Sequence, residues 1–275
     1  MEQFKRLYNK KERANLVFNL LIYLIFFVYS FYIVITNPQE PFSWLIGFVA
    51  VVFVAFSLLK EFLGFNYKKA IHLLTVERDP EAGFVQIKIV EKYDLLRSFK
   101  AACLIYNVLV RLDRHETDTL NTYLQSFETT QTKDLVLVKA YAHFKIQVFK
   151  KNKTQMKKAY ASLHELKNMK HKGKPVFTPL FAWEDIEAEY EYLINDYKKA
   201  NSLLTSLNTA AMNPRELDQH NLLMAKVFIQ LGKQKEALPL LQSIASSSKL
   251  NAYGQEATQY ITTIKETHES TSIHR

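Results

Sequence analysis

Two long runs of apolar residues stand near the beginning of the chain. The first covers 14–36, where Asn15 and Asn19 are the only strongly polar side chains, and the second covers 42–59 without a charge. Helices rise ~1.5 Å per residue, so runs of this length cross a hydrocarbon layer of ~30 Å. Core helices of soluble proteins carry a polar face, which both runs lack. The pattern therefore predicts two transmembrane helices, over 14–36 and 42–64.

The segment 37–41 separates the two runs and contains two prolines. It is too short to form a domain, and proline favours the end of one helix and the start of the next. Tyr29, Tyr32 and Trp44 lie towards this segment, and aromatic rings commonly settle at the level of the lipid headgroups. We therefore expect a tight helical hairpin with 37–41 as its external turn.

Basic residues flank the other ends of the two runs and are missing from the turn. They are Lys5, Arg6, Lys10, Lys11 and Arg13 before the first run, and Lys60, Lys68 and Lys69 after the second. The positive-inside rule therefore predicts a protein of the cell membrane with both termini cytoplasmic, and with 1–13 as a basic cytoplasmic N-terminus. A cleaved signal peptide is the competing interpretation. The first apolar run is longer than a usual signal core, however, and no small-x-small cleavage site follows it.

From residue 65 onwards, apolar residues recur with helical spacing between helix-start signals. Three of these signals place an N-capping residue before a proline: Asp79-Pro80, Thr178-Pro179 and Asn213-Pro214. Glu216 completes a capping-box spacing with the last of them. Six glycines and seven prolines are too few for the turns of a many-stranded sheet. We expect an all-α domain over 65–264, including the partly alternating segment 84–90, and a flexible tail over 265–275.

A lysine-rich tripeptide that ends in alanine recurs along the chain. Its copies are Lys68-Lys69-Ala70, Lys157-Lys158-Ala159, Lys198-Lys199-Ala200 and Lys235-Glu236-Ala237. The successive separations are 89, 41 and 37 residues, and the first is close to two of the later periods. Each copy is expected to open an amphipathic helix. The spacing indicates a helical repeat of about 37–44 residues.

The best copy, residues 218–248, resembles the tetratricopeptide repeat. Ala225 is the small residue of its first helix, Phe228 is the aromatic residue three positions later, and Gly232 forms the turn. Ala237 then takes the small position of the second helix. The resemblance implies paired helices that stack into a right-handed solenoid, in which the alanines allow close approach. The expected fold is thus a transmembrane helical hairpin followed by a tetratricopeptide-like solenoid.

Other segments resemble this repeat less closely. Residues 181–208 look like a second copy with a turn at 195–197, and residues 135–170 look like a weaker third. Residues 66–74 resemble a lone second helix directly after the membrane span. Residues 95–127 have the length of a hairpin without the alanine pattern.

Lysines concentrate over 139–174, where eleven lysines accompany one acidic residue, Glu165. The expected basic patch consists of Lys150, Lys151, Lys153, Lys157 and Lys158. Such a patch suits an acidic partner or anionic lipid headgroups. Lysine without arginine or interleaved exposed aromatics is weak evidence for nucleic acid. An acidic cluster follows around Trp183 and Tyr190, so the alternative is that the two charge patterns hold neighbouring hairpins together.

No catalytic or metal-binding motif stands out. The sequence has no Gly-x-Ser-x-Gly elbow, no phosphate-binding glycine-rich loop and no His-Glu-x-x-His motif. Cys103 is the single cysteine, and His164 and His171 are interpreted as surface residues rather than metal ligands. We therefore expect no enzyme activity, no cofactor and no metal.

Stacked hairpins form a concave groove, and the tetratricopeptide resemblance implies that a peptide or partner helix binds there. The expected groove residues come from three first helices: Tyr141, Lys145 and Gln147; Trp183, Glu187 and Tyr190; His220, Met224 and Lys226. The predicted function is a membrane-anchored scaffold or adaptor that binds a protein or peptide at the cytoplasmic face.

Two alternatives to this function stay open. One is a membrane-associated enzyme or transporter accessory subunit with an unrecognised site. Asn15 and Asn19 are the residues that best support this alternative, although a hydrogen bond to the neighbouring span explains their presence more simply. The other alternative is a nucleic-acid-binding regulator, which steeply salt-dependent binding would identify.

Overall fold

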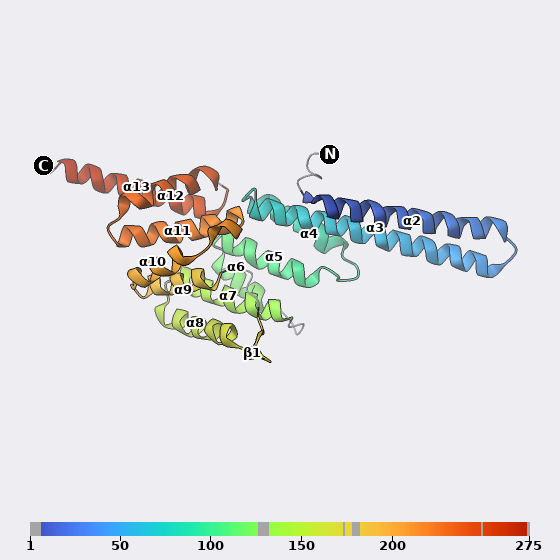
Figure 1. The fold of residues 1–275 in the computed structure, drawn as a ribbon, viewed down its shortest axis with the longest axis horizontal. Coiled ribbons are helices and arrows are strands. Elements are labelled where there is room, and N and C mark those ends of the chain that lie inside the picture. Colours follow the sequence, from blue (N-terminus) through green and yellow to red (C-terminus); the bar gives the residue numbers. More distant parts are fainter. Residues whose placement is uncertain (1–6, 126–131, 173, 178–181, 249, 274–275) are drawn as a thin grey trace.

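The computed structural model describes residues 7–125, 132–172, 174–177, 182–248 and 250–273. A long two-helix hairpin extends from one end of a group of shorter helices (Figure 1). Within the described ranges the only β-structure is a pair of two-residue antiparallel strands, β1 (Lys170–His171) and β2 (Lys174–Pro175). The expected all-α class is confirmed apart from this small ribbon. Lysine-rich sequence without β-branched residues gave no strand signal there.

The long hairpin consists of α2 (Lys10–Thr36) and α3 (Pro41–Thr75). α2 begins with a capping box, in which Asn9 and Glu12 bond each other's backbone N–H through their side chains. α3 begins with a proline at its first position. Both helices are long and apolar enough to cross a membrane, and only 11% of the apolar window in each is buried. The expected pair of apolar helices is confirmed. Residues 37–40 join them, and Pro41, expected in the turn, is already the first residue of α3.

Small side chains bring the two helices of the hairpin close together. Ser30 on α2 and Ser43 and Ala50 on α3 are buried, whereas most large apolar side chains of both helices are exposed. A Cβ atom built on Gly47 would lie 2.7 Å from Cγ2 of Val34. Helices approach this closely in an apolar environment where small residues line their interface.

Polar contacts join the same helices at the end of the hairpin near the N-terminus. The Asn19 side-chain amide donates to Oε1 of Glu61 over 3.0 Å, and Nζ of Lys68 lies 2.6 Å from Oε1 of Glu12. Asn19 therefore makes a hydrogen bond to the neighbouring span, as expected from its position in an apolar helix. Asn15 is exposed.

α3 extends well beyond its apolar part. The expected boundary at 64/65 is wrong as a helix end, because the helix continues without a break to Thr75. Gly64 is the one weak helix former in this stretch, and a single glycine costs too little to break a long helix. The tripeptide at 68–70 therefore lies inside a helix instead of opening one. Ala70 is fully buried, and its carbonyl oxygen accepts the hydroxyl of Tyr106 over 2.9 Å.

The rest of the chain forms consecutive short helices. They are α4 (Pro80–Tyr93), α5 (Lys100–Asp113), α6 (Thr117–Gln125), α7 (Lys133–Phe149), α8 (Lys153–Asn168), α9 (Trp183–Leu193), α10 (Tyr197–Ser206), α11 (Pro214–Gln230), α12 (Gln234–Ser247) and α13 (Ala252–Ile273), with a 3₁₀ turn η1 (Thr209–Ala211) before α11. Sequential neighbours such as α7 and α8, α9 and α10, and α11 and α12 pack against each other. We call α4 to α13, with the part of α3 beyond residue 64, the helical domain.

Two of the three expected proline helix starts are confirmed. Asp79 caps α4 through a hydrogen bond to the N–H of Ala82, and Asn213 and Glu216 form a complete capping box on α11. The segment 84–90 is helical, as expected. The third start, at Thr178-Pro179, lies outside the described residues.

The turns and close helix contacts expected of the repeats are present. Gly232 has φ +74°, as its position at a helix end requires, and Asn195 takes φ +70° in the turn between α9 and α10. The small residues at the predicted contact positions are fully buried: Ala188, Ala200, Ala225 and Ala237. Within the described part of the segment 95–127, α5 and α6 form a hairpin despite lacking this alanine pattern.

A flexible tail was expected from residue 265 onwards, but the last helix does not end there. α13 continues through Lys265 to Ile273, and Ile264 is buried. The polar composition of this end suits an exposed helix as well as an irregular tail, so composition alone could not separate the two.

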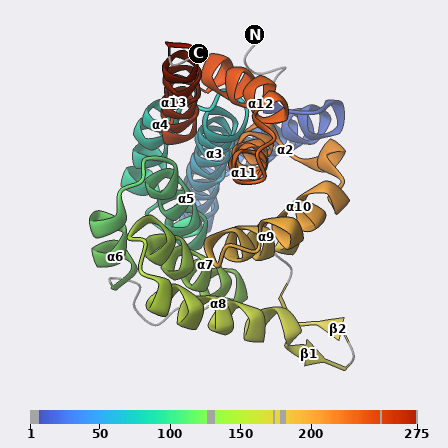
Figure 2. The same cartoon turned by 90° about the vertical axis from the view of Figure 1, so that its left-hand side faces the viewer.

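The helical domain follows an arc that runs from α4 to α10, and α11 lies inside it (Figure 2). α11 contacts both α3, where the arc begins, and α9, near its other end. The inner face of the arc is therefore covered by a helix of the same chain. The candidate site lies at this interface.

Candidate functional site

The tightest contact inside the arc joins α11 to the end of α5. Nε and NH2 of Arg215 both donate to the carboxylate of Asp113, which is 1% exposed as a side chain. The hydroxyl of Tyr253, on α13, lies 3.2 Å from the same carboxylate. A buried carboxylate is stable as an anion only when such partners replace its water. This contact ties α5, α11 and α13 together.

Asp218 forms a second polar contact one turn further along α11. Its Oδ2 atom lies 2.6 Å from Nε of Arg78, in the connection from α3 to α4, and accepts the hydroxyl of Ser248. Burial raises the pKa of Asp218 in spite of both partners, which act in the opposite direction. α11 is thereby held to the start of the arc as well.

α11 also contacts α7 and α9. The Gln219 side-chain amide donates to the Tyr141 hydroxyl over 3.0 Å, and Nδ1 of His220 lies 2.7 Å from Oδ1 of Asp185. His220 is 3% exposed and Tyr141 is 4% exposed. Polar groups buried this deeply are retained when each finds a partner. α11 thus carries polar side chains on several faces because it packs against the arc on one side and against α12 and α13 on the other.

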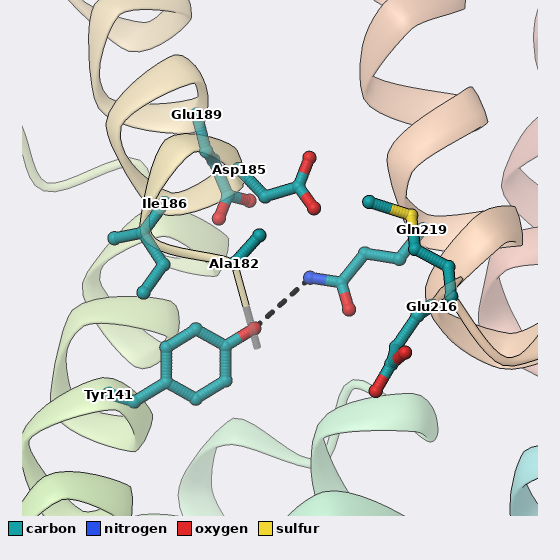
Figure 3. A pocket seen from close by; sticks show the side chains of 8 residues that line it. Tyr141, Ala182, Asp185, Ile186, Glu189, Glu216 and Gln219 are labelled. Carbon is teal, nitrogen blue, oxygen red and sulfur yellow. Dashed lines mark hydrogen bonds between the residues drawn. The ribbon is translucent and has the colours of Figure 1, made fainter. Parts of the chain in front are cut away.

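A small pocket of ≈ 60 Å³ remains between α7, α9 and α11 (Figure 3). It is lined by Tyr141, Ala182, Asp185, Ile186, Glu189, Met212, Glu216 and Gln219. Three of these side chains are carboxylates, and each already has a partner inside the chain. Asp185 faces His220, Glu189 pairs with Lys145 at 2.5 Å, and Glu216 accepts the N–H of Asn213.

The chemistry of this pocket favours a donor or a positive charge. Its carboxylates retain free lone pairs beyond the bonds that they make, because each oxygen accepts more than one hydrogen bond. Burial is the largest single influence on the pKa of Lys145 and lowers it, but Glu189, Tyr141 and Glu256 together outweigh burial, and the net pKa is raised. Lys145 therefore stays a cation and satisfies Glu189. No group of three metal-ligating side chains occurs within the described part of the chain.

The structure places most of the predicted groove residues in contacts within the chain. Tyr141, Lys145 and His220 are buried, and their partners are named above. Glu187 pairs with Lys167, and Nζ of Lys226 lies 2.5 Å from Oε1 of Glu256. The other groove residues are half-buried: Gln147, Trp183, Tyr190 and Met224. The ring of Tyr190 stacks on that of Tyr160 with 3.9 Å between centroids. Only Tyr141 among the nine lines the pocket.

The predicted basic patch is exposed throughout. Lys150, Lys151, Lys153, Lys157 and Lys158 all reach solvent. Lys150 makes an ion pair of 2.8 Å with Asp118, whose side chain is 88% exposed, so this pair is weak. The structural role expected for other lysines of 139–174 is confirmed at two ion pairs, Lys145 with Glu189 and Lys167 with Glu187.

Sequence reasoning missed the residues that hold α11 in place: Asp113, Arg215, Asp218 and Arg78. Each is a charged side chain among many others, with no motif around it. Glu191 gave a better signal, since it stands where the repeat expects an apolar residue. Its carboxylate is nearly buried and accepts Nζ of Lys199 over 2.6 Å.

Comparison of the chain with models of protein families, with curated proteins and with solved structures found no match.

Proposed function

We propose that this protein is a membrane-anchored helical scaffold that holds a protein partner at the cytoplasmic face of the membrane. The observation that carries the proposal is the continuity of α3. This single helix of 35 residues forms half of the apolar hairpin and then packs into the helical domain. A domain joined to a membrane span by a continuous helix keeps a fixed height above the bilayer. A scaffold benefits from such a rigid connection more than an enzyme does.

Lipid contact accounts for the exposed surface of the hairpin. Side chains such as Phe18, Ile25 and Phe48 are 62%, 67% and 68% exposed, and an apolar surface of this extent is unstable in water. The backbone of both helices is satisfied internally, as a hydrocarbon environment demands. The basic residues at 5–13 and after 59 support a cytoplasmic position for the termini and the helical domain.

The partner-binding role rests on the paired helices and on the pocket inside the arc. The resemblance of residues 218–248 to a tetratricopeptide repeat supports a protein partner, since stacked hairpins of that kind bind peptides on their inner face. Here α11 occupies much of that face. The pocket of Asp185, Glu189 and Glu216 is an opening beside α11, and it accepts a basic side chain of the partner.

The membrane topology can be tested by cysteine labelling, starting from Cys103→Ser, which removes the natural thiol. Gln39→Cys puts a thiol in the exposed turn of the hairpin, and Ser202→Cys puts one on the exposed surface of α10. A membrane-impermeant maleimide should label residue 39 in intact cells and residue 202 only after permeabilisation. Labelling of both thiols in intact cells, or of residue 202 alone, would contradict the proposed anchor.

The partner site can be tested by photo-crosslinking in membranes. A crosslinking amino acid at Met212, which lines the pocket, should give a defined protein adduct, whereas the same residue at Ser202 should not. Gln219→Lys places a cation in the pocket and should abolish the adduct. Gln230→Lys, an exposed position at the end of the same helix, is the matched control and should preserve it. An adduct that survives Gln219→Lys unchanged would rule out the pocket as the binding site.

A further inference from the structure

Two leucines outside the long hairpin are conspicuously exposed. Leu95 and Leu96 are 71% and 67% exposed in the connection between α4 and α5. They lie next to each other in the chain, and Tyr93 beside them is 44% exposed. Large apolar side chains exposed together mark a contact with another apolar surface more often than isolated ones do.

Hydrogen bonds hold this connection, which we call the α4–α5 loop (residues 94–99), in one conformation. The Asp94 carboxylate accepts the N–H of Ser98 over 2.9 Å and that of Phe99 over 2.7 Å. Arg97 adopts φ +56° and donates its N–H to the carbonyl of Asp94. The exposure of the two leucines is therefore a feature of an ordered turn.

The loop lies at the level where α3 leaves its apolar part. α4 runs back along α3, so that the ring of Tyr93 meets the edge of Phe62 with 6.4 Å between centroids. On the far side of the loop, Phe99 contacts Tyr67 at 5.7 Å. Lys60 is the first charged residue after the uncharged run, and Phe62 lies only ~3 Å further along the helix axis. In Figure 1 the loop lies at the end of the helical domain that faces the hairpin.

The charges around the loop suit a lipid surface. Lys60, Lys92, Arg97 and Lys100 are exposed. The nearby acidic groups are engaged within the chain: Asp94 with the backbone as above, and Glu91 with Lys88 and Asn107. Exposed leucines with basic neighbours form the pattern that binds the boundary between headgroups and acyl chains.

We propose that the α4–α5 loop inserts into the cytoplasmic interface of the bilayer, with Leu95 and Leu96 below the headgroups and the surrounding basic side chains against anionic lipid. This inference rests on the proposed membrane anchor and adds a third membrane contact to its two spans. The two antiparallel helices of the hairpin leave the domain free to tilt with them in the bilayer. A contact beside them fixes the tilt, and with it the direction in which the pocket faces.

Fluorescence quenching in proteoliposomes tests the insertion. In the Cys103→Ser background, a fluorophore is attached to Leu96→Cys, Phe48→Cys or Leu250→Cys in separate preparations. Phe48 is in the middle of the apolar part of α3. Leu250 is 61% exposed and lies near Tyr253, which contacts the opposite end of α5, so it is a matched exposed leucine away from the membrane. The vesicles contain phosphatidylglycerol and a lipid that carries a nitroxide quencher either near the headgroup or deep in the acyl chain.

The expected result is loss of emission at position 96 with the shallow quencher, at position 48 with the deep quencher, and at position 250 with neither. Quenching at 48 but not at 96 overturns the loop insertion and leaves the anchor intact. Quenching at neither position overturns both. A blue-shifted but unquenched label at 96 indicates cover by protein, and it also overturns the inference.

A charge variant provides the second measurement. Arg97→Glu with Lys100→Glu should reduce shallow quenching at position 96 in vesicles with phosphatidylglycerol and leave deep quenching at position 48 unchanged. Equal quenching at 96 with and without these changes would remove the anionic-lipid part of the proposal.

Discussion

Arg215 of α11 donates two hydrogen bonds to the carboxylate of Asp113, although 102 residues separate the two in the chain. This pair closes the arc of the helical domain. Arg215→Ala leaves Asp113 buried without its cation, so we expect a loss of about 3–5 kcal/mol in the free energy of unfolding. Urea unfolding in detergent, followed by circular dichroism, measures it.

Two further variants separate this effect from general damage. Lys150→Ala removes an exposed ion pair and should cost at most about 1 kcal/mol. Replacing both members of the buried pair, with Asp113→Leu and Arg215→Met, removes the uncompensated charge. This double variant should be more stable than Arg215→Ala. If Arg215→Ala unfolds at the same urea concentration as Lys150→Ala, the pair does not close the arc.

Gly83 and Tyr106 form a second tight contact, between α4 and α5. A Cβ on Gly83 would lie 2.1 Å from the Tyr106 hydroxyl, which also bonds the carbonyl of Ala70. Gly83→Ala therefore displaces a buried ring, and we expect a loss of about 1–3 kcal/mol by overpacking. Thermal unfolding should show a clear fall in Tm.

Removing the clashing hydroxyl should partly restore the packing. Tyr106→Phe alone costs about 1 kcal/mol, since it leaves the Ala70 carbonyl without this donor. Combined with Gly83→Ala it should cost less than the two single changes added together. Strict additivity would show that the hydroxyl is not what opposes the extra methyl group.

Within the hairpin, Gly47 and Gly64 make a matched pair on one helix. An added Cβ meets Val34 at Gly47 but has nothing within 4 Å at Gly64. Alanine is the better helix former by about 0.5–1 kcal/mol, so Gly64→Ala should raise the Tm in detergent. Gly47→Ala should lower it, because the stiff valine side chain has to move. Equal shifts in the same direction at both positions would mean that the two helices do not pack through Gly47.

His115 makes stability depend on pH. Its ring packs 4.3 Å from that of Phe149 and 6.0 Å from that of Tyr253. Burial lowers the pKa of His115 below its usual 6.5, and Lys145 and Lys226 act in the same direction. The neutral ring is favoured in the folded state. The stability that the folded state gains from the neutral His115 ring is therefore present above the usual pKa of histidine and is lost as the pH falls below it.

We expect the Tm of the wild type to fall between about pH 7.5 and pH 5, and His115→Asn to flatten part of that fall. Asparagine is chosen because residue 115 has φ +53°, which asparagine tolerates. His143, whose pKa burial also lowers, should account for a further part. An unchanged pH profile in His115→Asn would exclude this role.

The local features of this protein could be predicted from its sequence alone. The two apolar runs without a polar face can be recognised directly in the sequence as long apolar helices. Asn213 and Glu216 cap α11 through contacts within one helical turn. The alanines at 188, 200, 225 and 237 mark close contacts between helices that follow each other. Each of these features depends on residues that are close together in the sequence, and at such short separations the sequence spacing determines the distance in space.

The contacts in the interior of the helical domain, by contrast, became evident only from the three-dimensional packing. α11 fills the inner face of the arc, so Tyr141, Lys145 and His220 are buried in contacts within the chain. Arg215, Asp218 and Gln219 look like surface residues in sequence, because polar side chains are usually solvated. Their partners lie up to 140 residues away, as between Asp218 and Arg78, and no local pattern encodes such a pairing. The continuity of α3 was hidden for a related reason: the change from apolar to charged residues marks a change of surroundings, while the backbone remains helical.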